Sequence, residues 1–184
     1  MQLVRPASEH LAGYCEALSR GWSPNTTRPE AAQEQLADIA ADAAAFLAIA
    51  HDPEALGPPV KLPDGSQVQR LPGIVRWMWS DEGFCGSINL RWPRDLGPMP
   101  PHVLGHIGYA VVPWQQRRGH ATQALAQLLP LARSFGLREV ELTTDVDNAP
   151  SQRVITANGG ELRERFTKPE AFGGGAGLRF VIRL

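Results

Sequence analysis

The stretch Gln116-Arg117-Arg118-Gly119-His120-Ala121-Thr122 decides the fold, because it stands between a short apolar strand and a helix. Residues 106–112 form the strand, and the helix that follows has a clear apolar stripe. Such a loop exposes backbone N–H groups at a helix N-terminus, where the helix dipole also favours negative charge. Gly119 lets the backbone approach a ligand closely. The stretch therefore predicts a binding site for a pyrophosphate.

Composition places the chain among ordinary globular proteins, with an enzyme as the default and a binding module as the alternative. It has 184 residues, 43% of them hydrophobic, and a formal net charge of −1. This length suits one domain over residues 1–184, and the near-neutral charge argues against a nucleic-acid partner. The longest apolar run, residues 43–50, is too short to span a bilayer, and the N-terminus lacks the apolar stretch of a signal peptide. We expect Cys15 and Cys85 to be reduced thiols of a cytoplasmic, bacterial-type enzyme with no membrane partner.

Periodicity and turn residues divide the chain into strand, two helices, a β-hairpin, and then strand–helix–strand–helix–strand–strand. The expected strands cover about residues 2–5, 74–79, 84–91, 106–112, 139–143, 160–166 and 178–184. The expected helices cover about residues 9–19, 30–50, 121–135 and 149–158. This order predicts an α/β fold with a mixed sheet, of the α+β type. The pyrophosphate loop would lie where the chain crosses from a strand to a helix.

Two motifs together resemble the GNAT superfamily of acetyl-CoA-dependent N-acetyltransferases. Residues 116–121 match the family pattern Gln/Arg-x-x-Gly-x-Gly/Ala at every fixed position. Residues 148–155, followed by Asn158-Gly159-Gly160, look like the family's second crossover helix. The segments 86–91 and 105–109 narrow the resemblance to a group of poorly characterised bacterial predicted acetyltransferases. The match is carried by about residues 74–184.

The resemblance implies a mostly antiparallel twisted sheet of about six to seven strands, splayed at its centre and flanked by about four helices. It places the cofactor-binding core at about residues 105–160, with acetyl-CoA as co-substrate and no metal, and it allows a homodimer. The backbone of Tyr109, Ala110, Val111 and Val112 would pair with the pantetheine arm like an added strand. Asn148 would contact the cofactor where the two crossover helices diverge. The residues that would hold the pyrophosphate are Gln116, Arg117, Arg118, Gly119, His120, Ala121 and Thr122.

The catalytic candidates are His106 and Ser151. His106 lies close to the position where many family members keep a catalytic Glu, and an imidazole can accept a proton at neutral pH. The alternative is a structural His106 that hydrogen-bonds a neighbouring loop. Family members often carry a Tyr acid seven residues after the helix Asn, but that position is Ile155 here. Ser151 would then hydrogen-bond the sulfur, or it is only a cap partner of the helix.

Two functions stay open. The first is an N-acetyltransferase that acts on an amine of a small molecule or peptide by direct attack on the thioester. The second is a CoA-binding sensor or scaffold with little catalysis, which Ile155 favours and His106 opposes. The acceptor should be shaped by residues 20–35, 53–73 and 91–105, and the sequence does not identify it. The i, i+4 spacing of His102 and His106 would suit a metal on a helix, which the neighbouring prolines disfavour.

Overall fold

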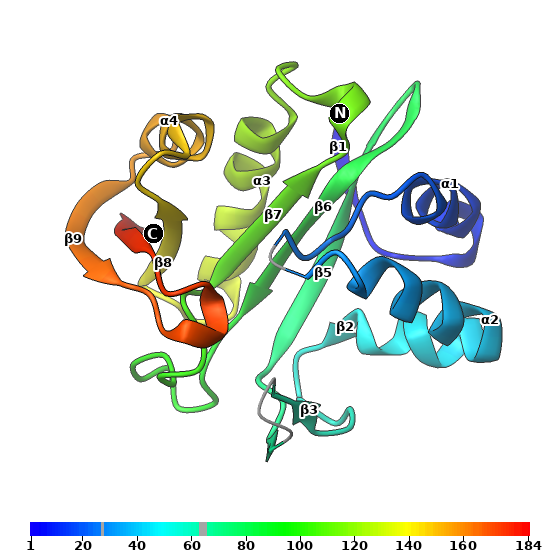
Figure 1. Cartoon of the computed structure of the whole chain (residues 1–184), viewed down its shortest axis with the longest axis horizontal. Coiled ribbons are helices and arrows are strands. Elements are labelled where there is room, and N and C mark those ends of the chain that lie inside the picture. The colour runs from blue at the N-terminus through cyan, green and yellow to red at the C-terminus, as the bar shows by residue number, and fades with distance from the viewer. Residues whose placement is uncertain (27, 63–65) are drawn as a thin grey trace.

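The computed structural model describes residues 1–26, 28–62 and 66–184, and its main strands form two antiparallel sheets (Figure 1). The first sheet has the order β1-β5-β6-β7, with the short β2 beside β5. Its strands are β1 (Gln2–Val4), β2 (His51–Asp52), β5 (Gly73–Ser80), β6 (Gly83–Arg91) and β7 (Ile107–Val111). The second sheet, in the order β8-β10-β9, consists of β8 (Glu139–Asp145), β9 (Glu161–Thr167) and β10 (Ala176–Arg183). A separate small pair joins β3 (Val60–Lys61) and β4 (Gln67–Val68).

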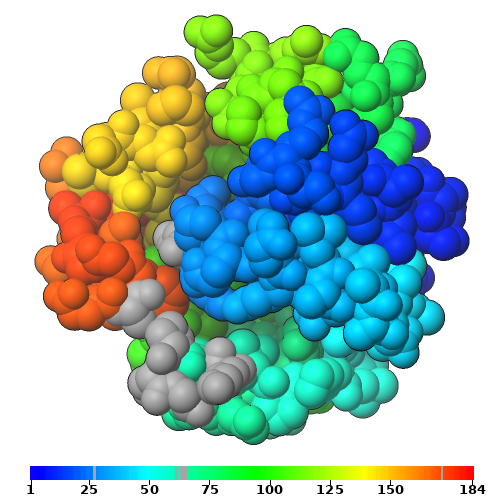
Figure 2. All heavy atoms as spheres, turned by 45° about the vertical axis from the view of Figure 1, so that its right-hand side comes forward, coloured from blue at the N-terminus to red at the C-terminus, as the bar shows by residue number. Residues whose placement is uncertain are grey.

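Helices cover both faces of the first sheet. α1 (Ser8–Ser19) and α2 (Ala31–Ile49) lie on one face, and α3 (His120–Ser134) lies on the other (Figure 1). α4 (Ala149–Ala157) stands beside the second sheet, and two single 3₁₀ turns are η1 (Pro113–Gln115) and η2 (Glu170–Phe172). In Figure 2 the blue and cyan atoms of α1 and α2 form one continuous surface. No helix within the described ranges is long and apolar enough to cross a membrane. The predicted order of the main elements is confirmed, and the structure adds the short strands β2, β3 and β4 between α2 and β5.

The β5–β6 hairpin gives each face of the first sheet its own chemistry. Side chains alternate across a strand, so neighbouring residues serve opposite faces. Ile88 and Leu90 are almost fully buried in the core that α3 covers. Ser87 and Asn89 point to the other face, where they line a pocket. The same strand therefore supplies an apolar wall to one side and polar groups to the other.

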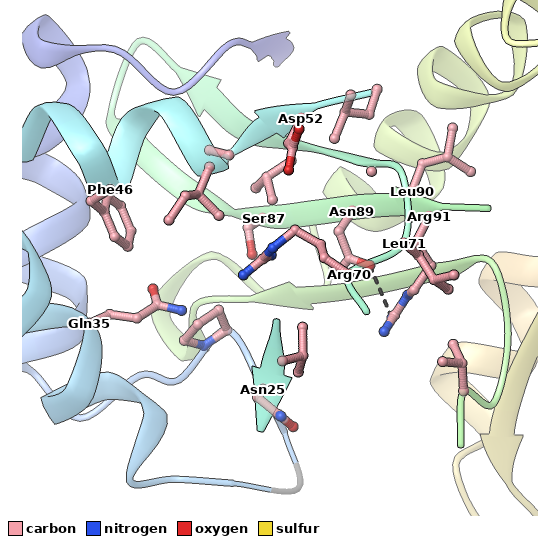
Figure 3. A pocket seen from close by; sticks show the side chains of 18 of the residues that line it. Asn25, Gln35, Phe46, Asp52, Arg70, Leu71, Ser87, Asn89, Leu90 and Arg91 are labelled. Carbon is pink, nitrogen blue, oxygen red and sulfur yellow. Dashed lines mark hydrogen bonds between the residues drawn. The ribbon is translucent and has the colours of Figure 1, made fainter. Parts of the chain in front are cut away.

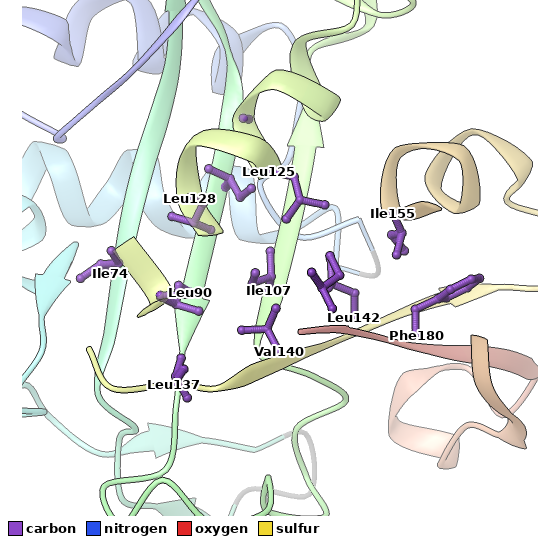
Figure 4. Close-up of a cluster of buried hydrophobic side chains, with 14 of the residues drawn as sticks. Ile74, Leu90, Ile107, Leu125, Leu128, Leu137, Val140, Leu142, Ile155 and Phe180 are labelled. Atoms are coloured by element: carbon purple, nitrogen blue, oxygen red, sulfur yellow. The ribbon is translucent and has the colours of Figure 1, made fainter. Parts of the chain in front are cut away.

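A single apolar core joins the two sheets under α3 (Figure 4). Leu125 and Leu128 of α3 are 0% exposed, and they belong to the same cluster as Leu142 of β8 and Phe180 of β10. The opposite face has a smaller aromatic core, in which Tyr14 stacks on Trp77 with 4.4 Å between ring centroids. Packing on both sides holds the first sheet rigid, which fixes the position of β7.

Candidate functional site

The two sheets meet at the start of β7 and then separate. His106 donates its N–H to the carbonyl of Glu141 on β8 at 2.8 Å, and the Glu141 N–H donates to His106 Nδ1 at 3.0 Å. Gly105 is so close that a Cβ there would lie 2.8 Å from the Glu141 oxygen. Beyond this point, no ladder pairing joins β7 to β8 in the described chain. The strands diverge, which is the central splay that the resemblance predicted, and the gap between the backbones of β7 and β8 is called the opening below.

The edge of β7 that faces this opening pairs with no other strand in the described chain. Val112 donates its N–H to β6 at 3.0 Å. Successive residues of an antiparallel strand point their backbone groups to alternate sides, so Tyr109 and Val111 point theirs away from β6. The groups of Ala110, like those of Val112, point toward β6. Of the four residues predicted to pair with a pantetheine arm, Tyr109 and Val111 thus present their backbone to the opening. Gln116 Nε2 reaches back to the Val111 carbonyl at 3.4 Å.

The predicted pyrophosphate loop lies directly beyond this edge, at the start of α3. Gly119 precedes the helix with φ 77°, a left-handed conformation that glycine adopts without strain. No side chain caps α3, and the N–H groups of His120, Ala121 and Thr122 have no acceptor among the described residues. Around Gly119 the space is open, because a Cβ there would find only Gln123 Nε2 within 4 Å. Unpaired N–H groups beside a small residue at a helix N-terminus fit a diphosphate.

The two arginines of the loop have different partners. Arg118 Nη1 contacts both carboxylate oxygens of Glu82, at 2.8 and 2.9 Å, and Gln115 Nε2 donates to the same carboxylate at 3.0 Å. The hydrogen bonds from Gln115 and Arg118 lower the pKa of Glu82, so this carboxylate stays charged. Arg117 is exposed, has φ 61°, and forms no ion pair with the described residues. The charge of Arg117 is thus available to a ligand, whereas that of Arg118 is already balanced.

Across the opening, the first turn of α4 carries Asn148 and Ser151. Asn148 Oδ1 accepts the Ser151 N–H at 3.1 Å, so Asn148 is the N-cap of α4, with Pro150 in the first turn. The Ser151 hydroxyl lies 2.8 Å from the Tyr109 hydroxyl. Burial raises the pKa of Tyr109, which keeps its hydroxyl protonated. A pair of hydroxyls therefore bridges β7 and α4 in this opening.

Ile155 does not face the opening. It is 0% exposed and packs in the core that joins the two sheets (Figure 4). A Cβ at Gly160 would lie 2.3 Å from Ile155 Cγ2, so the turn after α4 is fitted closely around this side chain. The position that would carry the family's Tyr acid is an apolar core position in this chain.

His106 is buried and held by β8. Its Nδ1 accepts the Glu141 N–H, so the neutral ring carries its proton on Nε2. Burial lowers the pKa of His106, which keeps the ring neutral at pH 7. In this state neither ring nitrogen offers a free lone pair. The geometry therefore favours the structural alternative for His106 over the role of a proton acceptor.

A pocket of about 580 Å³ lies on the face of the first sheet that α2 covers (Figure 3). All three segments that were expected to shape the acceptor site contribute to it, and its polar lining residues are Asn25, Gln35, Asp38, Asp52, Gln69, Arg70, Ser87, Asn89, Arg91 and His102. The pocket approaches β7 at Gly108, where a Cβ would lie 3.4 Å from Arg91 Nη2. β7 thus has the diverging strands along one edge, and Arg91 and Asn89 of the pocket lining lie next to its residue Gly108. Within the described ranges, no group of three or more His, Cys, Asp or Glu side chains is placed to hold a metal ion.

Sequence reasoning found the loop and the helix cap but missed three side chains of the site. These are the Tyr109 hydroxyl, Glu82 and Arg91. The bond between Tyr109 and Ser151 joins residues 42 positions apart, and that between Arg118 and Glu82 joins residues 36 apart. The spacing of the sequence carries no signal for such contacts. For Arg91 the sequence does contain one indication. Arg91 ends a predicted strand whose alternate residues are polar, which places it on the polar face of that strand.

Comparison with known families identifies the fold. Residues 2–161 match the family described as the acetyltransferase (GNAT) domain. No curated protein sequence matches the chain significantly.

Solved structures of acetyltransferases share the fold at low sequence identity. RimL, a ribosomal L7/L12 α-N-protein acetyltransferase in complex with coenzyme A, is 13% identical, with a TM-score of 0.64 over 99% of this chain and 93% of its own. The aminoglycoside acetyltransferase AAC(6')-Ib, in complex with coenzyme A and kanamycin, is 13% identical, with a TM-score of 0.58 over 99% of this chain and 94% of its own. The microcin C7 self-immunity acetyltransferase MccE, in complex with acetyl-CoA and AMP, is 13% identical, with a TM-score of 0.56 over 99% and 91%.

The family match covers most of the chain, and the two diverging sheets and the uncapped loop before α3 agree with it. The chain therefore belongs to the GNAT family of acetyltransferases.

Proposed function

We propose that the protein transfers the acetyl group of acetyl-CoA to an amine of a small molecule or peptide, by direct attack of the amine on the thioester. One observation carries the proposal. The open edge of β7 leads straight to the unpaired N–H groups at the start of α3, while a pocket approaches the same strand at Gly108. The extended pantetheine arm needs a strand edge to pair with, and the diphosphate next to it needs unpaired N–H groups. The amine needs separate access to the thioester, which the pocket would give.

The donor would be held by backbone groups more than by side chains. Tyr109 and Val111 would pair with the amides of the pantetheine arm along the edge of β7. The N–H groups from Arg117 to Thr122 would hold the pyrophosphate, and the free guanidinium of Arg117 would add a charge-assisted contact. Asn148, which caps α4, would lie beside the arm where α3 and α4 diverge. Acetyl-CoA supplies the activated acyl group and the thiolate leaving group.

The proton for the departing thiolate would come from the hydroxyl pair. In this scheme Ser151 donates its hydroxyl proton to the sulfur and recovers one from Tyr109, and the proton released by the amine restores the balance through solvent. The support is the 2.8 Å contact between the two hydroxyls and the raised pKa of Tyr109, which keeps a proton on the pair at pH 7. A Tyr on α4 is then unnecessary, which agrees with the burial of Ile155.

His106 would act by position. Its bonds to Glu141 tie β7 to β8 at the base of the opening, and this tie sets where the strands begin to diverge. The amine would reach the thioester in its neutral form by losing a proton to solvent. The same proposal places the enzyme in the cytoplasm of a bacterium.

Two measurements on the full chain test this function and separate it from a CoA-binding module. Calorimetric titration with acetyl-CoA measures donor binding, and release of free CoA thiol measures turnover with a panel of amines. We expect saturable donor binding, and turnover with at least one amine well above the rate of acetyl-CoA hydrolysis. Binding without amine-stimulated turnover would leave only the sensor or scaffold function. Absence of binding would refute both functions.

A further inference from the structure

Arg91 is a partly buried cation that forms no ion pair with any carboxylate in the described residues. It stands at the end of β6 and lines the pocket beside α2. Its Nη2 donates to Asn89 Oδ1 at 3.1 Å, as the dashed line in Figure 3 shows. Its Nε is buried with no hydrogen-bond partner, and no carboxylate lies within ion-pair distance in the part of the chain that the structure describes. Burial also lowers the pKa of Arg91, although a guanidinium stays charged in proteins.

A buried charge without a partner is costly, because desolvation is not offset by an ion pair. The other arginine of the pocket is in a different position. Arg70 donates its Nε to the Pro58 carbonyl at 3.1 Å, and its charge acts on the carboxylate of Asp52. Asp52 in turn accepts the N–H groups of Leu56 and Gly57, so it is satisfied within its own loop. Among the described residues, Arg91 is therefore a pocket cation with no carboxylate at ion-pair distance.

Arg91 lies close to β7, so a group bound to its charge would lie close to the proposed reaction site. A Cβ at Gly108 would lie 3.4 Å from Arg91 Nη2 and 3.4 Å from Asn89 Nδ2, so both side chains lie against this position of the strand. The proposed thioester would lie along the edge of the same strand. An acceptor that placed an anionic group on Arg91 would thus bring the rest of a short molecule toward the reacting centre.

We infer that the acceptor is an amine that also carries a carboxylate, and that Arg91 binds this carboxylate. The inference rests on the proposed acetyl transfer. One guanidinium flanked by the neutral side chains of Ser87 and Asn89 balances a single negative charge, which suits a carboxylate better than a phosphate dianion. A polycationic acceptor would meet repulsion at Arg91. The substrate class is therefore amino acids, or peptides with a free C-terminus, that are short enough to reach from Arg91 to the edge of β7.

The experiment compares amines of equal chain length that end in a carboxylate, a methyl group or an ammonium group, together with short peptides that have free or amidated C-termini. Turnover by the full chain is measured from CoA thiol release. We expect kcat/KM for the carboxylate-bearing amine to exceed that for the neutral amine by about 10- to 100-fold, with the ammonium-bearing amine lowest. Arg91→Gln should bring the ratio of carboxylate to neutral amine close to one, and Arg91→Lys should give a partial loss. Arg133→Gln, on the exposed surface of α3, is the control and should leave the ratio unchanged.

The outcomes separate the two proposals. Calorimetric binding of acetyl-CoA to Arg91→Gln must match the wild type, which also shows that the variant is folded. If wild type turns over amines without preference for the carboxylate, or if Arg91→Gln keeps the preference, the inference about the acceptor is wrong while acetyl transfer stands. If no amine is turned over, binding of the carboxylate-bearing amines in the presence of CoA is measured directly. Binding that Arg91→Gln abolishes supports the site alone, and absence of binding overturns it.

Discussion

The Tyr109 hydroxyl lies 2.8 Å from the Ser151 hydroxyl, although one residue belongs to β7 and the other to α4. Tyr109 also contacts the Ser151 carbonyl at 3.3 Å. The two contacts join β7 to α4 across the opening. They put a proton donor beside the path proposed for the thioester without a Tyr on α4.

Removing either hydroxyl should slow the chemical step. We expect Ser151→Ala and Tyr109→Phe each to lower kcat by about 10- to 100-fold, with little change in the Kd of acetyl-CoA. The double variant should be hardly slower than Ser151→Ala, because both residues serve one proton path and their effects are not additive. Steady-state kinetics over a range of pH measures these values. Thr156→Val, which removes an exposed hydroxyl from the same helix, is the control, and a kcat within twofold of wild type for both single variants would exclude the proton path.

A side chain at Gly119 should prevent donor binding. We expect Gly119→Glu to weaken acetyl-CoA binding by about 100-fold or more, because the variant adds backbone strain and a negative charge where the N–H groups await a diphosphate. The matched control is Gly159→Glu, since Gly159 has φ 81° and nothing within 4 Å of a Cβ. Both variants carry the same strain and charge. Equal affinity of the two variants for acetyl-CoA would place the pyrophosphate elsewhere.

The two loop arginines should contribute unequally to donor affinity. Arg117→Gln should raise the Kd of acetyl-CoA by about 3- to 10-fold and reduce its dependence on ionic strength, because this charge is unpaired and exposed. Arg118→Gln should have a smaller effect, since Glu82 already balances this guanidinium. Calorimetric titrations at low and high salt measure both effects. A larger loss for Arg118→Gln would mean that Glu82 releases Arg118 when the donor binds.

His106 should act on stability more than on proton transfer. Because burial lowers the pKa of His106 in the fold, the unfolded chain binds a proton first as the pH falls below about 6.5. The contribution of His106 to the free energy of unfolding is therefore fully present above about pH 6.5. It is lost as the pH falls toward the lower pKa that His106 has in the folded protein. His106→Asn, whose amide oxygen can accept the Glu141 N–H, should show a smaller loss between about pH 6.5 and 5. Urea unfolding across this range measures the difference, with His102→Asn as the control.

The activity of His106 variants decides between its two roles. If His106 acts by position, His106→Asn should keep kcat within a few fold of wild type, while His106→Ala loses the side-chain bond to Glu141 and keeps only the backbone bond. If it accepts a proton, both variants should lose about 100-fold or more and the acid limb of the pH–rate profile should vanish. The second result would contradict the positioning role proposed above.

Ile155 should matter for stability alone. Ile155→Ala should lower the free energy of unfolding by about 2–5 kcal/mol, and Ile155→Val by about 0.5–1.5 kcal/mol, because the side chain is fully buried. Ile155→Tyr should destabilise the fold through overpacking and should not raise kcat. Denaturant unfolding together with thiol-release kinetics tests this. A faster enzyme with Tyr at this position would show that the side chain reaches the opening.

The sequence was sufficient for features that depend on neighbouring residues. Gly119 marked the loop before α3, Asn148 with Pro150 marked the start of α4, and the turn near Glu82 marked the β5–β6 hairpin. Each of these is a local preference of the backbone that the residue type itself expresses.

The remaining features of the site arise from packing between distant segments. Whether His106 accepts a hydrogen bond from β8, or offers a lone pair to a substrate, depends on Glu141, which lies 35 residues away. Whether Ile155 faces the opening depends on the rotation of α4 against the core that joins the sheets. The unpaired charge of Arg91 became visible once the pocket and its other charges were in place. No spacing in the sequence encodes these relations.

The proposed function and the arrangement of β7, with diverging strands along its edge and a pocket that approaches it at Gly108, together predict the kinetic scheme of the enzyme. In the proposed function each substrate would have its own route to the strand, so neither would have to leave before the other enters, and both would be bound together when the acetyl group is transferred. Initial-rate plots should therefore intersect, as for a ternary complex, and no acetylated protein should accumulate when the acceptor is withheld. On the proposed function, we therefore expect the five-residue strand β7 to bring donor and acceptor together without an acetylated form of the protein.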